Sequence, residues 1–236
     1  LSASLLVGCS SGTASSVPVS ASSAAESTVS SVEETASSAV DENEAAAAQL
    51  LNDLTGSYQE LWPVILADEY KQTWLDDCTA LVGEDNAEAA FEKLSSMVTG
   101  DVYGEDAVKA YANGGGAYFC GFTNSLAILT FDGETSTISG TDKDGNVLFS
   151  HAYHYIGMEP VRGLYEFESD DADSGEFTYF FLAPDTSAET YHIEFRYGSD
   201  AEALSQYDTG EYAYWLASGI STDCDQTMID NCIELF

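Results

Sequence analysis

One short segment of the sequence, Tyr191 to Gly198, carries residue types that could bind a metal ion. Apolar and polar residues alternate along it, which is typical of a β-strand with one face in a hydrophobic core. The packed face would be formed by Tyr191, Ile193, Phe195 and Tyr197, and the polar face by His192, Glu194 and Arg196. A histidine and a glutamate two positions apart on a strand project side by side. His192 and Glu194 could therefore offer an imidazole nitrogen and a carboxylate oxygen to one cation, such as zinc.

The same pattern has a plainer interpretation. The polar residues could form the wet face of a half-buried strand, with Arg196 neutralising Glu194 and no ligand present. A short H-x-E pattern is common, so the elements around it must decide between the two interpretations.

Helical spacing of apolar residues precedes the region of strands. Helices are predicted over Glu42 to Asp53, over Leu66 to Val82 with Cys78 on the buried stripe, and along Phe91 to Val98 after a possible cap at Asn86. A shorter helix over Glu105 to Ala112 should stop at the glycines that follow.

From Ala117 the apolar period changes to two, which predicts consecutive antiparallel strands joined by tight turns. The predicted strands are Ala117 to Phe122, Leu126 to Phe131, Thr135 to Ser139, Val147 to Tyr155, Leu164 to Glu168, Phe177 to Leu182 and Thr190 to Tyr197. The predicted class is thus α+β and mainly antiparallel β, a small closed or nearly closed barrel with helices at its ends.

The acidic loops of this region are predicted to be simple turns. Asp142 to Gly145 looks like part of a calcium loop, but Gly140 and His151 stand where calcium ligands should be, so a hairpin turn is expected. The run Glu168 to Asp173 is expected to be a solvated charge run between strands.

The first residues predict a membrane anchor. Leu5 to Gly8 precede Cys9 as in a bacterial lipobox, so residues 1–9 are expected to be a truncated lipoprotein signal peptide ending at a lipidated Cys9. Residues 10–41 are rich in Ser and Ala and contain no Lys, Arg or aromatic residue, which predicts a disordered linker. Residues 42–236 then form one domain held outside the cytoplasm, at the cell membrane.

The net charge excludes one class of partner. Six Lys and Arg stand against forty-one Asp and Glu, a formal charge of −35, so the protein should repel nucleic acid. The sequence has no G-x-S-x-G, no H-E-x-x-H and no phosphate-binding glycine loop, so we do not expect an enzyme.

Three segments carry a family resemblance. The stretch Leu54 to Pro63 has Tyr58 and Trp62 at its aromatic positions, Ala183-Pro184 precedes the H-x-E strand, and that strand ends at Gly198. Together they resemble the ZinT (YodA) family, extracytoplasmic zinc-binding proteins with a lipocalin-like (calycin) barrel, and the resemblance runs from about Leu54 to Phe236. His192 and Glu194 then take the places of the two histidines in the family's H-F-H strand motif.

The resemblance implies a zinc-binding lipoprotein, with zinc or cadmium as ligand, that assists an ABC-type importer and contacts its binding protein. The family's further zinc-binding histidine falls on Phe180, whose ring donates nothing. His154 or His151 could supply the missing ligand. Three positions apart on a strand, they point to opposite faces, so only one of them can enter the barrel. The apolar periodicity of the strand does not show which one. The alternative is a degenerate barrel without metal that binds a small apolar ligand or a protein partner.

Four cysteines besides Cys9 leave the disulfide question open. An exported protein can form disulfides, but no C-x-x-C pair is present. If Asp223 to Leu235 is one helix, Cys224 and Cys232 lie roughly 12 Å apart and cannot bridge each other. If both are oxidised, each must pair with Cys78 or Cys120; free buried thiols are the alternative.

Overall fold

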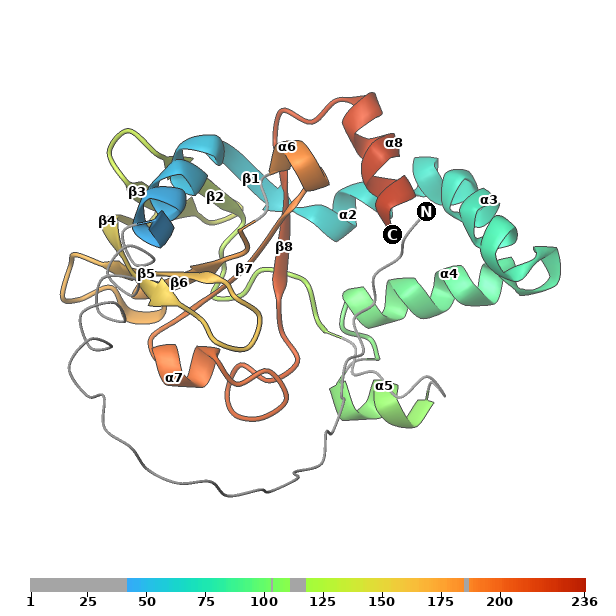
Figure 1. Cartoon of the computed structure of the whole chain (residues 1–236). Helices are drawn as coiled ribbons and strands as arrows, with labels where there is room; N and C mark the ends of the chain where they lie inside the picture. Colours follow the sequence, from blue (N-terminus) through green and yellow to red (C-terminus); the bar gives the residue numbers. More distant parts are fainter. Residues whose placement is uncertain (1–41, 103, 111–117, 185–186) are drawn as a thin grey trace, which may run out of the picture.

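The computed structural model describes residues 42–102, 104–110, 118–184 and 187–236. Eight strands in these residues form a closed barrel in which each strand pairs antiparallel with its sequence neighbours and the first pairs with the last (Figure 1). This confirms the predicted barrel with flanking helices. The strands are β1 (Gly56–Glu60), β2 (Ile128–Asp132), β3 (Thr137–Thr141), β4 (Val147–Met158), β5 (Tyr165–Ser169), β6 (Tyr179–Leu182), β7 (Ile193–Gly198) and β8 (Ala217–Ser221).

Helices stand before, between and after the strands. They are the helix over residues 42–53, α2 (Leu61–Ile65), α3 (Lys71–Val82), α4 (Glu84–Val98), α5 (Gly104–Ala110), α6 (Ser187–Thr190), α7 (Ala201–Leu204) and α8 (Gln226–Leu235), with 3₁₀ helices at Asp68–Tyr70 and Gly175–Phe177. No helix in the described ranges is long and apolar enough to cross a membrane.

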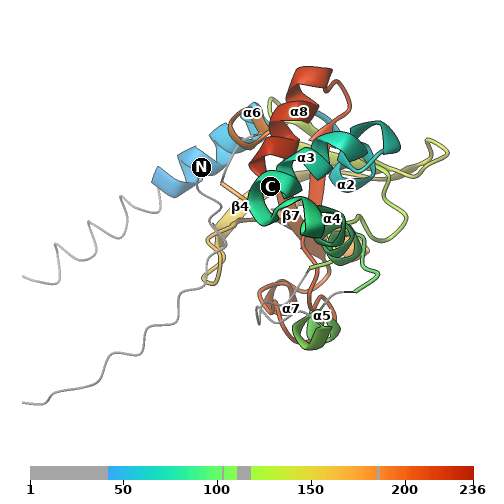
Figure 2. The ribbon, with the colours of Figure 1, turned by 90° about the vertical axis from the view of Figure 1, so that its right-hand side faces the viewer.

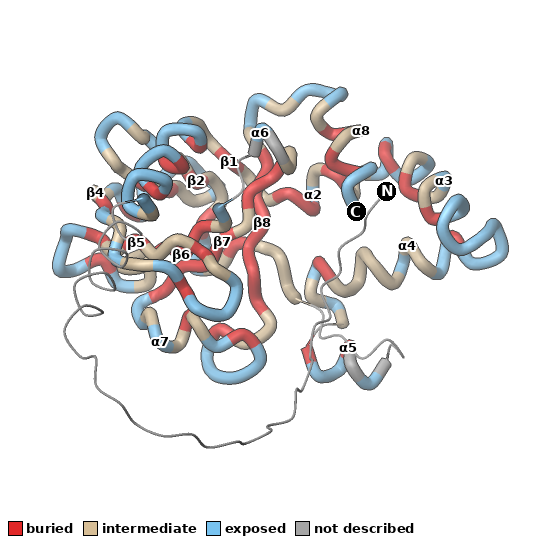
Figure 3. The backbone as a smooth tube through the Cα atoms, viewed as in Figure 1, coloured by how far each residue is buried: buried red, intermediate tan, exposed pale blue. Residues whose placement is uncertain are grey.

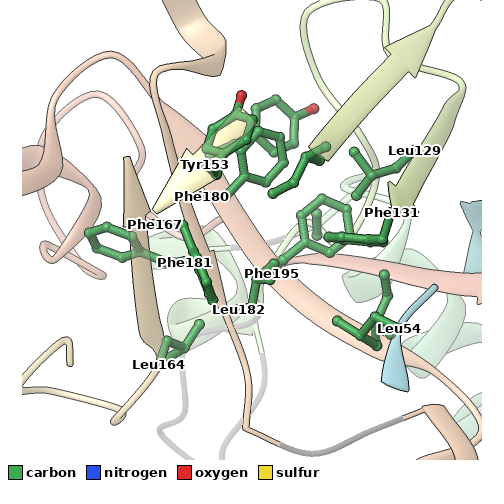
Figure 4. Packing of buried hydrophobic residues seen from close by; sticks show 14 of the residues in the cluster. Leu54, Leu129, Phe131, Tyr153, Leu164, Phe167, Phe180, Phe181, Leu182 and Phe195 are labelled. Atoms are coloured by element: carbon green, nitrogen blue, oxygen red, sulfur yellow. The ribbon is translucent and has the colours of Figure 1, made fainter. Parts of the chain in front are cut away.

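The barrel interior is packed with aromatic rings (Figure 4). Phe180, Phe195 and Tyr197 are fully buried, and their ring centroids lie 5.3–6.5 Å apart in stacked arrangements. The helix over residues 42–53 adds Leu50 and Leu51 to the same core. Side chains at alternate positions of a strand point into the barrel. Figure 3 shows buried residues along the strands of the barrel.

A second hydrophobic core lies outside the barrel, where Ile220 of β8 packs with residues of α2, α3 and α8. Figure 2 shows these three helices beside one another. Trp62 and Trp74 stack there with centroids 6.4 Å apart, and Trp74 Nε1 donates to the Ile65 carbonyl at 2.6 Å. That hydrogen bond uses an indole to satisfy a carbonyl at the end of α2. The other buried members are Leu61, Ile65, Tyr70, Val98, Ile220, Ile229, Cys232 and Ile233.

The prediction of one helix over Leu66 to Val82 is wrong at its start. The structure has α2, then an extended Ala67 with ψ of 147°, and α3 begins only at Lys71. This break turns the chain so that Trp74 packs back on α2. The predicted cap is also wrong, since Gly83 is the N-cap of α4 and Asn86 lies inside it, donating Nδ2 to the Val82 carbonyl at 3.1 Å.

Two strands were missed and one predicted strand is absent. β1 lies in the Leu54 to Pro63 stretch, for which no strand is predicted, and β8 consists of small residues with a weak strand pattern, yet these two close the barrel. Described residues 118–122 of the segment predicted as Ala117 to Phe122 contribute a single bridge, from Phe119 to Trp215, instead of a strand. The other strands lie within a few residues of their predicted positions.

The predicted hairpin at Asp142 is confirmed. It joins β3 to β4, and the Asp142 carboxylate accepts hydrogen bonds from the backbone N–H groups of Asp144 and Asn146, both at 2.9 Å. The aspartate therefore closes a turn. The predicted end of the helix after Ala110 lies outside the described residues, as do Cys9 and the predicted linker.

Candidate metal centre

His192 and Glu194 lie on the outer surface of the barrel. Ile193, Phe195 and Tyr197 point into the barrel core, as the alternation predicts. Tyr191 departs from the pattern because it precedes β7 with a positive φ of 62° and packs against the second core instead. The polar face of the strand therefore points away from the barrel interior.

The His192 ring is held in a defined orientation. Its Nδ1 lies 2.7 Å from the Thr190 carbonyl, and the Thr190 hydroxyl donates to the His192 carbonyl at 2.6 Å. With the Nδ1 proton donated to that carbonyl, Nε2 is the ring nitrogen left for a metal, the usual arrangement of metal-binding histidines. Nε2 is 3.8 Å from Glu194 Oε1.

The two side chains differ in exposure. The His192 side chain is 8% exposed and the Glu194 side chain 41% exposed. The Phe236 ring covers the imidazole with centroids 5.2 Å apart, so the pair is open to solvent only on the glutamate side.

Two effects oppose each other in the pKa of His192. Burial lowers the pKa, but hydrogen bonding to the Cys232 thiol, to Glu194 and to the Thr190 carbonyl raises it by more. The resulting pKa is about 10. In the absence of a metal the ring is therefore an imidazolium at neutral pH, and a cation must displace that proton to bind Nε2.

Two cysteines influence the pKa values in this region. Cys232 on α8 is fully buried in the second core and raises the pKa of His192. Burial raises the pKa of the Cys120 thiol to about 12, and the Glu194 carboxylate raises it too. Sequence reasoning did not connect these thiols with the site, because they come from segments about 40 and 70 residues away and no motif links them.

Arg196 does not neutralise Glu194, so the plainer interpretation of the strand is wrong on this point. The guanidinium is fully buried and donates to the carbonyls of Leu204 and Tyr212, with its centre 4.4 Å from the Tyr207 ring. Burial lowers the pKa of Arg196. Its role in the described structure is to tie the 204–212 segment to β7.

His151 and His154 point to opposite faces of β4, as predicted. His151 shares the inner face with Phe149 and Tyr153, and its Nδ1 lies 2.6 Å from Asp171 Oδ2. His154 faces outward and pairs with Asp170 Oδ1 at 2.7 Å. These aspartates belong to the run predicted to be only solvated.

Neither histidine meets the His192 pair in this structure. Strands β5 and β6 separate β4 from β7, which places the two strands about 14 Å apart around the sheet. Phe180 is likewise remote, because it is fully buried and points into the barrel, whereas His192 and Glu194 point out of it. The three positions that carry histidine in the family therefore do not converge here.

The donor set fits zinc only in part. In a tetrahedral zinc site, nitrogen and oxygen ligands lie about 3.4 Å apart, close to the 3.8 Å between His192 Nε2 and Glu194 Oε1. Within the described ranges, no three His, Cys, Asp or Glu side chains are grouped so as to hold a metal ion. The cysteines Cys78, Cys120, Cys224 and Cys232 are all free thiols in the structure.

Comparison with solved structures identifies the architecture. The crystal structure of the Zn(II)-bound ZinT-like domain of Streptococcus pneumoniae AdcA matches with a TM-score of 0.50 and 15% identity, over 78% of this chain and 89% of that domain. The chain has a ZinT-like fold.

A second match of this ZinT-like fold is Zn(II)-bound AdcA from the same organism, at 16% identity and a TM-score of 0.48, covering 79% of this chain and 35% of AdcA. The chain thus spans about a third of that protein's length. A scan against protein-family models and a search of curated proteins give no match.

Proposed function

We propose that the chain binds a divalent cation, zinc or cadmium, as cargo outside the cytoplasm. The observation that carries the proposal is the His192 imidazole, fixed at Nδ1 by the Thr190 carbonyl with Nε2 turned toward the Glu194 carboxylate at 3.8 Å. Imidazole and carboxylate are accepted zinc ligands. The ZinT-like fold, found in a Zn(II)-bound domain, supports the same assignment.

The electrostatic surroundings support cation binding as well. Arg196 is engaged elsewhere, so the formal charge of Glu194 is opposed only by His192 among its described ion pairs. A chain with a net charge of −35 also raises the local concentration of cations.

The site should bind weakly compared with a site of three histidines. Two protein donors leave two tetrahedral positions to water or to a donor that moves in, and the imidazolium proton of His192 competes with the metal. Weak binding suits a cation that must be released again. We propose that the protein delivers the cation to the binding protein of an ABC-type importer.

Zinc titration of the metal-stripped full-length protein by calorimetry tests the proposal. His192→Ala should abolish binding. The matched control is His154→Ala, because this histidine also faces outward beside a carboxylate, but both side chains of that pair are more than half exposed and its Nδ1 is hydrogen-bonded to Asp170; the affinity of this variant should equal that of the parent. Equal binding by the parent and His192→Ala would remove this site.

The location is a separate proposal with its own test. We propose that Cys9 is lipidated and that residues 10–41 tether the domain to the cell membrane, on the composition of the sequence alone. Expression with a complete signal peptide should give a membrane-bound protein, and Cys9→Ala should release it. A parent that stays in the cytoplasm would contradict the proposal.

The alternative ligand, a small apolar molecule in the barrel, finds no support in the interior. Phe149 and Phe177 stack there with centroids 4.0 Å apart, and Phe180 packs against both Phe149 and Tyr153. An apolar guest would have to displace these rings.

A further inference from the structure

A cavity of about 420 Å³ lies at the end of the barrel where β7 ends, outside the packed interior. This volume is typical of small-molecule sites. Three aromatic residues, Phe119, Tyr212 and Trp215, and two carboxylates, Glu176 and Glu211, line it. In Figure 1 this is the end of the barrel at which α7 lies, opposite α6. The described residues that line the cavity include no Lys or Arg, so it combines aromatic walls with negative charge.

The Trp215 ring of the cavity wall is fixed from two sides. Its Nε1 donates to the Gly121 carbonyl at 2.8 Å, and the Tyr197 ring packs edge-to-face against it with centroids 5.0 Å apart. The Tyr212 ring lies beside Trp215, with a centroid separation of 6.2 Å. Both wall residues are buried. The aromatic wall is therefore in place before a ligand binds, which reduces the cost of binding.

Two glycines let the rings approach the backbone closely. A Cβ at Gly198, where the H-x-E strand ends, would lie 2.5 Å from Tyr212 Cζ, and a Cβ at Gly121 would lie 2.5 Å from Phe119 Cζ. Carbon atoms in contact are normally about 3.5–4.0 Å apart. A side chain at either glycine would displace a ring of the cavity wall, so these glycines set the position of two of the three rings.

The Glu176 carboxylate is held against the aromatic wall. Its Oε2 accepts a hydrogen bond from the Tyr212 hydroxyl at 3.0 Å, and its Oε1 accepts one from the Ser199 hydroxyl at 3.1 Å. The Tyr212 oxygen in turn accepts from the Ser199 backbone N–H at 3.1 Å. Among the described residues, no Lys or Arg is ion-paired with Glu176 or with the exposed Glu211. The negative charge of both glutamates is thus available to a ligand.

We propose that this cavity binds a small organic cation, an alkylated ammonium ion. The faces of aromatic rings attract a cation and also contact its alkyl groups, and the carboxylates supply the opposite charge. An anion would be repelled by both glutamates, and an uncharged apolar molecule would leave their charge unmatched.

This inference is independent of the proposed metal site. His192 and Glu194 act at the start of β7, whereas the cavity lies at its end, and His192 and Gly198 are about 20 Å apart along the strand. Binding at one site can therefore be measured without the other.

Titration of the full-length protein with choline, followed by calorimetry, tests the inference. Neohexanol has the shape of choline without its charge, so it should bind at least about 10-fold more weakly. Phosphocholine carries the same ammonium beside a phosphate, as a lipid headgroup does. It should also bind more weakly than free choline, because the carboxylates repel the phosphate.

Two exposed glutamates provide matched variants. Glu211→Gln removes one charge at the cavity and should weaken choline binding about 3-fold, the effect expected of a solvent-exposed charge. Glu202→Gln, on α7, removes the same charge from the protein but does not line the cavity. Its affinity for choline should equal that of the parent.

Nuclear magnetic resonance places the ligand in the parent protein. Choline should shift the indole N–H signal of Trp215 and leave those of Trp62 and Trp74, which lie in the second core, unchanged. No choline binding, equal binding of neohexanol, tighter binding of phosphocholine, or shifts at Trp62 or Trp74 alone would each overturn the inference. These readouts need no variant to fold, and zinc binding through His192 would stand or fall separately.

Discussion

The two faces of β7 have opposite character. Its inner face contributes Ile193, Phe195 and Tyr197 to an interior of packed rings. Its outer face carries Glu194, and His192 lies just before the strand on the same side, covered by the Phe236 ring at the C-terminus. In this barrel the described interior is packed with rings, and the proposed divalent-cation site lies on the outer wall.

The most severe loss of stability is expected from Arg196→Ala, which tests whether the outer face is structural beyond the His192 pair. The change leaves buried carbonyls of Leu204 and Tyr212 without a donor, and we expect the free energy of unfolding to fall by about 3–5 kcal/mol in denaturant titrations.

Arg162→Ala is the matched control for that variant. Arg162 is exposed and stacks on the Tyr118 and Tyr207 rings with its guanidinium centre 4.8 and 4.6 Å from their centroids, so its loss should cost about 1 kcal/mol or less. A normally stable Arg196→Ala with altered zinc affinity would place this arginine in the site instead.

Phe180→His directly tests which face of the barrel binds a cation. It places a histidine where the resemblance to the ZinT family implies one, but the new ring would point into the packed interior, so we expect a loss of about 3 kcal/mol in unfolding free energy and no gain in zinc affinity by calorimetry. Phe180→Leu serves as the apolar control. Tighter zinc binding by Phe180→His would show that the site lies inside the barrel.

The interior should also resist ionisation. Burial raises the pKa of Tyr197 to about 12 despite its hydrogen bonds with Thr123, compared with 10.0 for the unperturbed group. A raised pKa contributes stability that is complete below pH 10 and is lost as the pH rises toward 12, up to about 2.7 kcal/mol for a two-unit shift. The unfolding free energy of Tyr197→Phe should fall less than that of the parent over this range; parallel curves would contradict a dry interior.

The smallest effect is expected at His154 and Asp170, on the outer face of a different strand. Both side chains are more than half exposed, so His154→Ala should change the unfolding free energy by less than about 1 kcal/mol in thermal or denaturant unfolding. A larger loss would indicate that this pair, too, is part of a built site.

Much of the fold could be predicted from alternating residues. The strands from β2 to β7 follow stretches in which β-branched and aromatic residues recur at every second position, and this period is a local property. β8 could not be found in this way, because Ala217 to Ser221 are mostly small and the strand exists only because β7 and β1 lie on either side of it. Barrel closure is a tertiary effect.

The candidate site divides in the same manner. The sequence by itself determined that His192 and Glu194 share a face, that Phe180 lacks a donor atom, and that His151 and His154 point to opposite sides of their strand, since each follows from the two-residue period or from side-chain chemistry. Only the tertiary structure decided that the shared face is the outer one and that the Phe236 ring covers His192. Periodicity relates a residue to its neighbours on one strand, whereas the choice of the inner face and the contact with the C-terminal residue depend on how the whole chain buries its apolar surface.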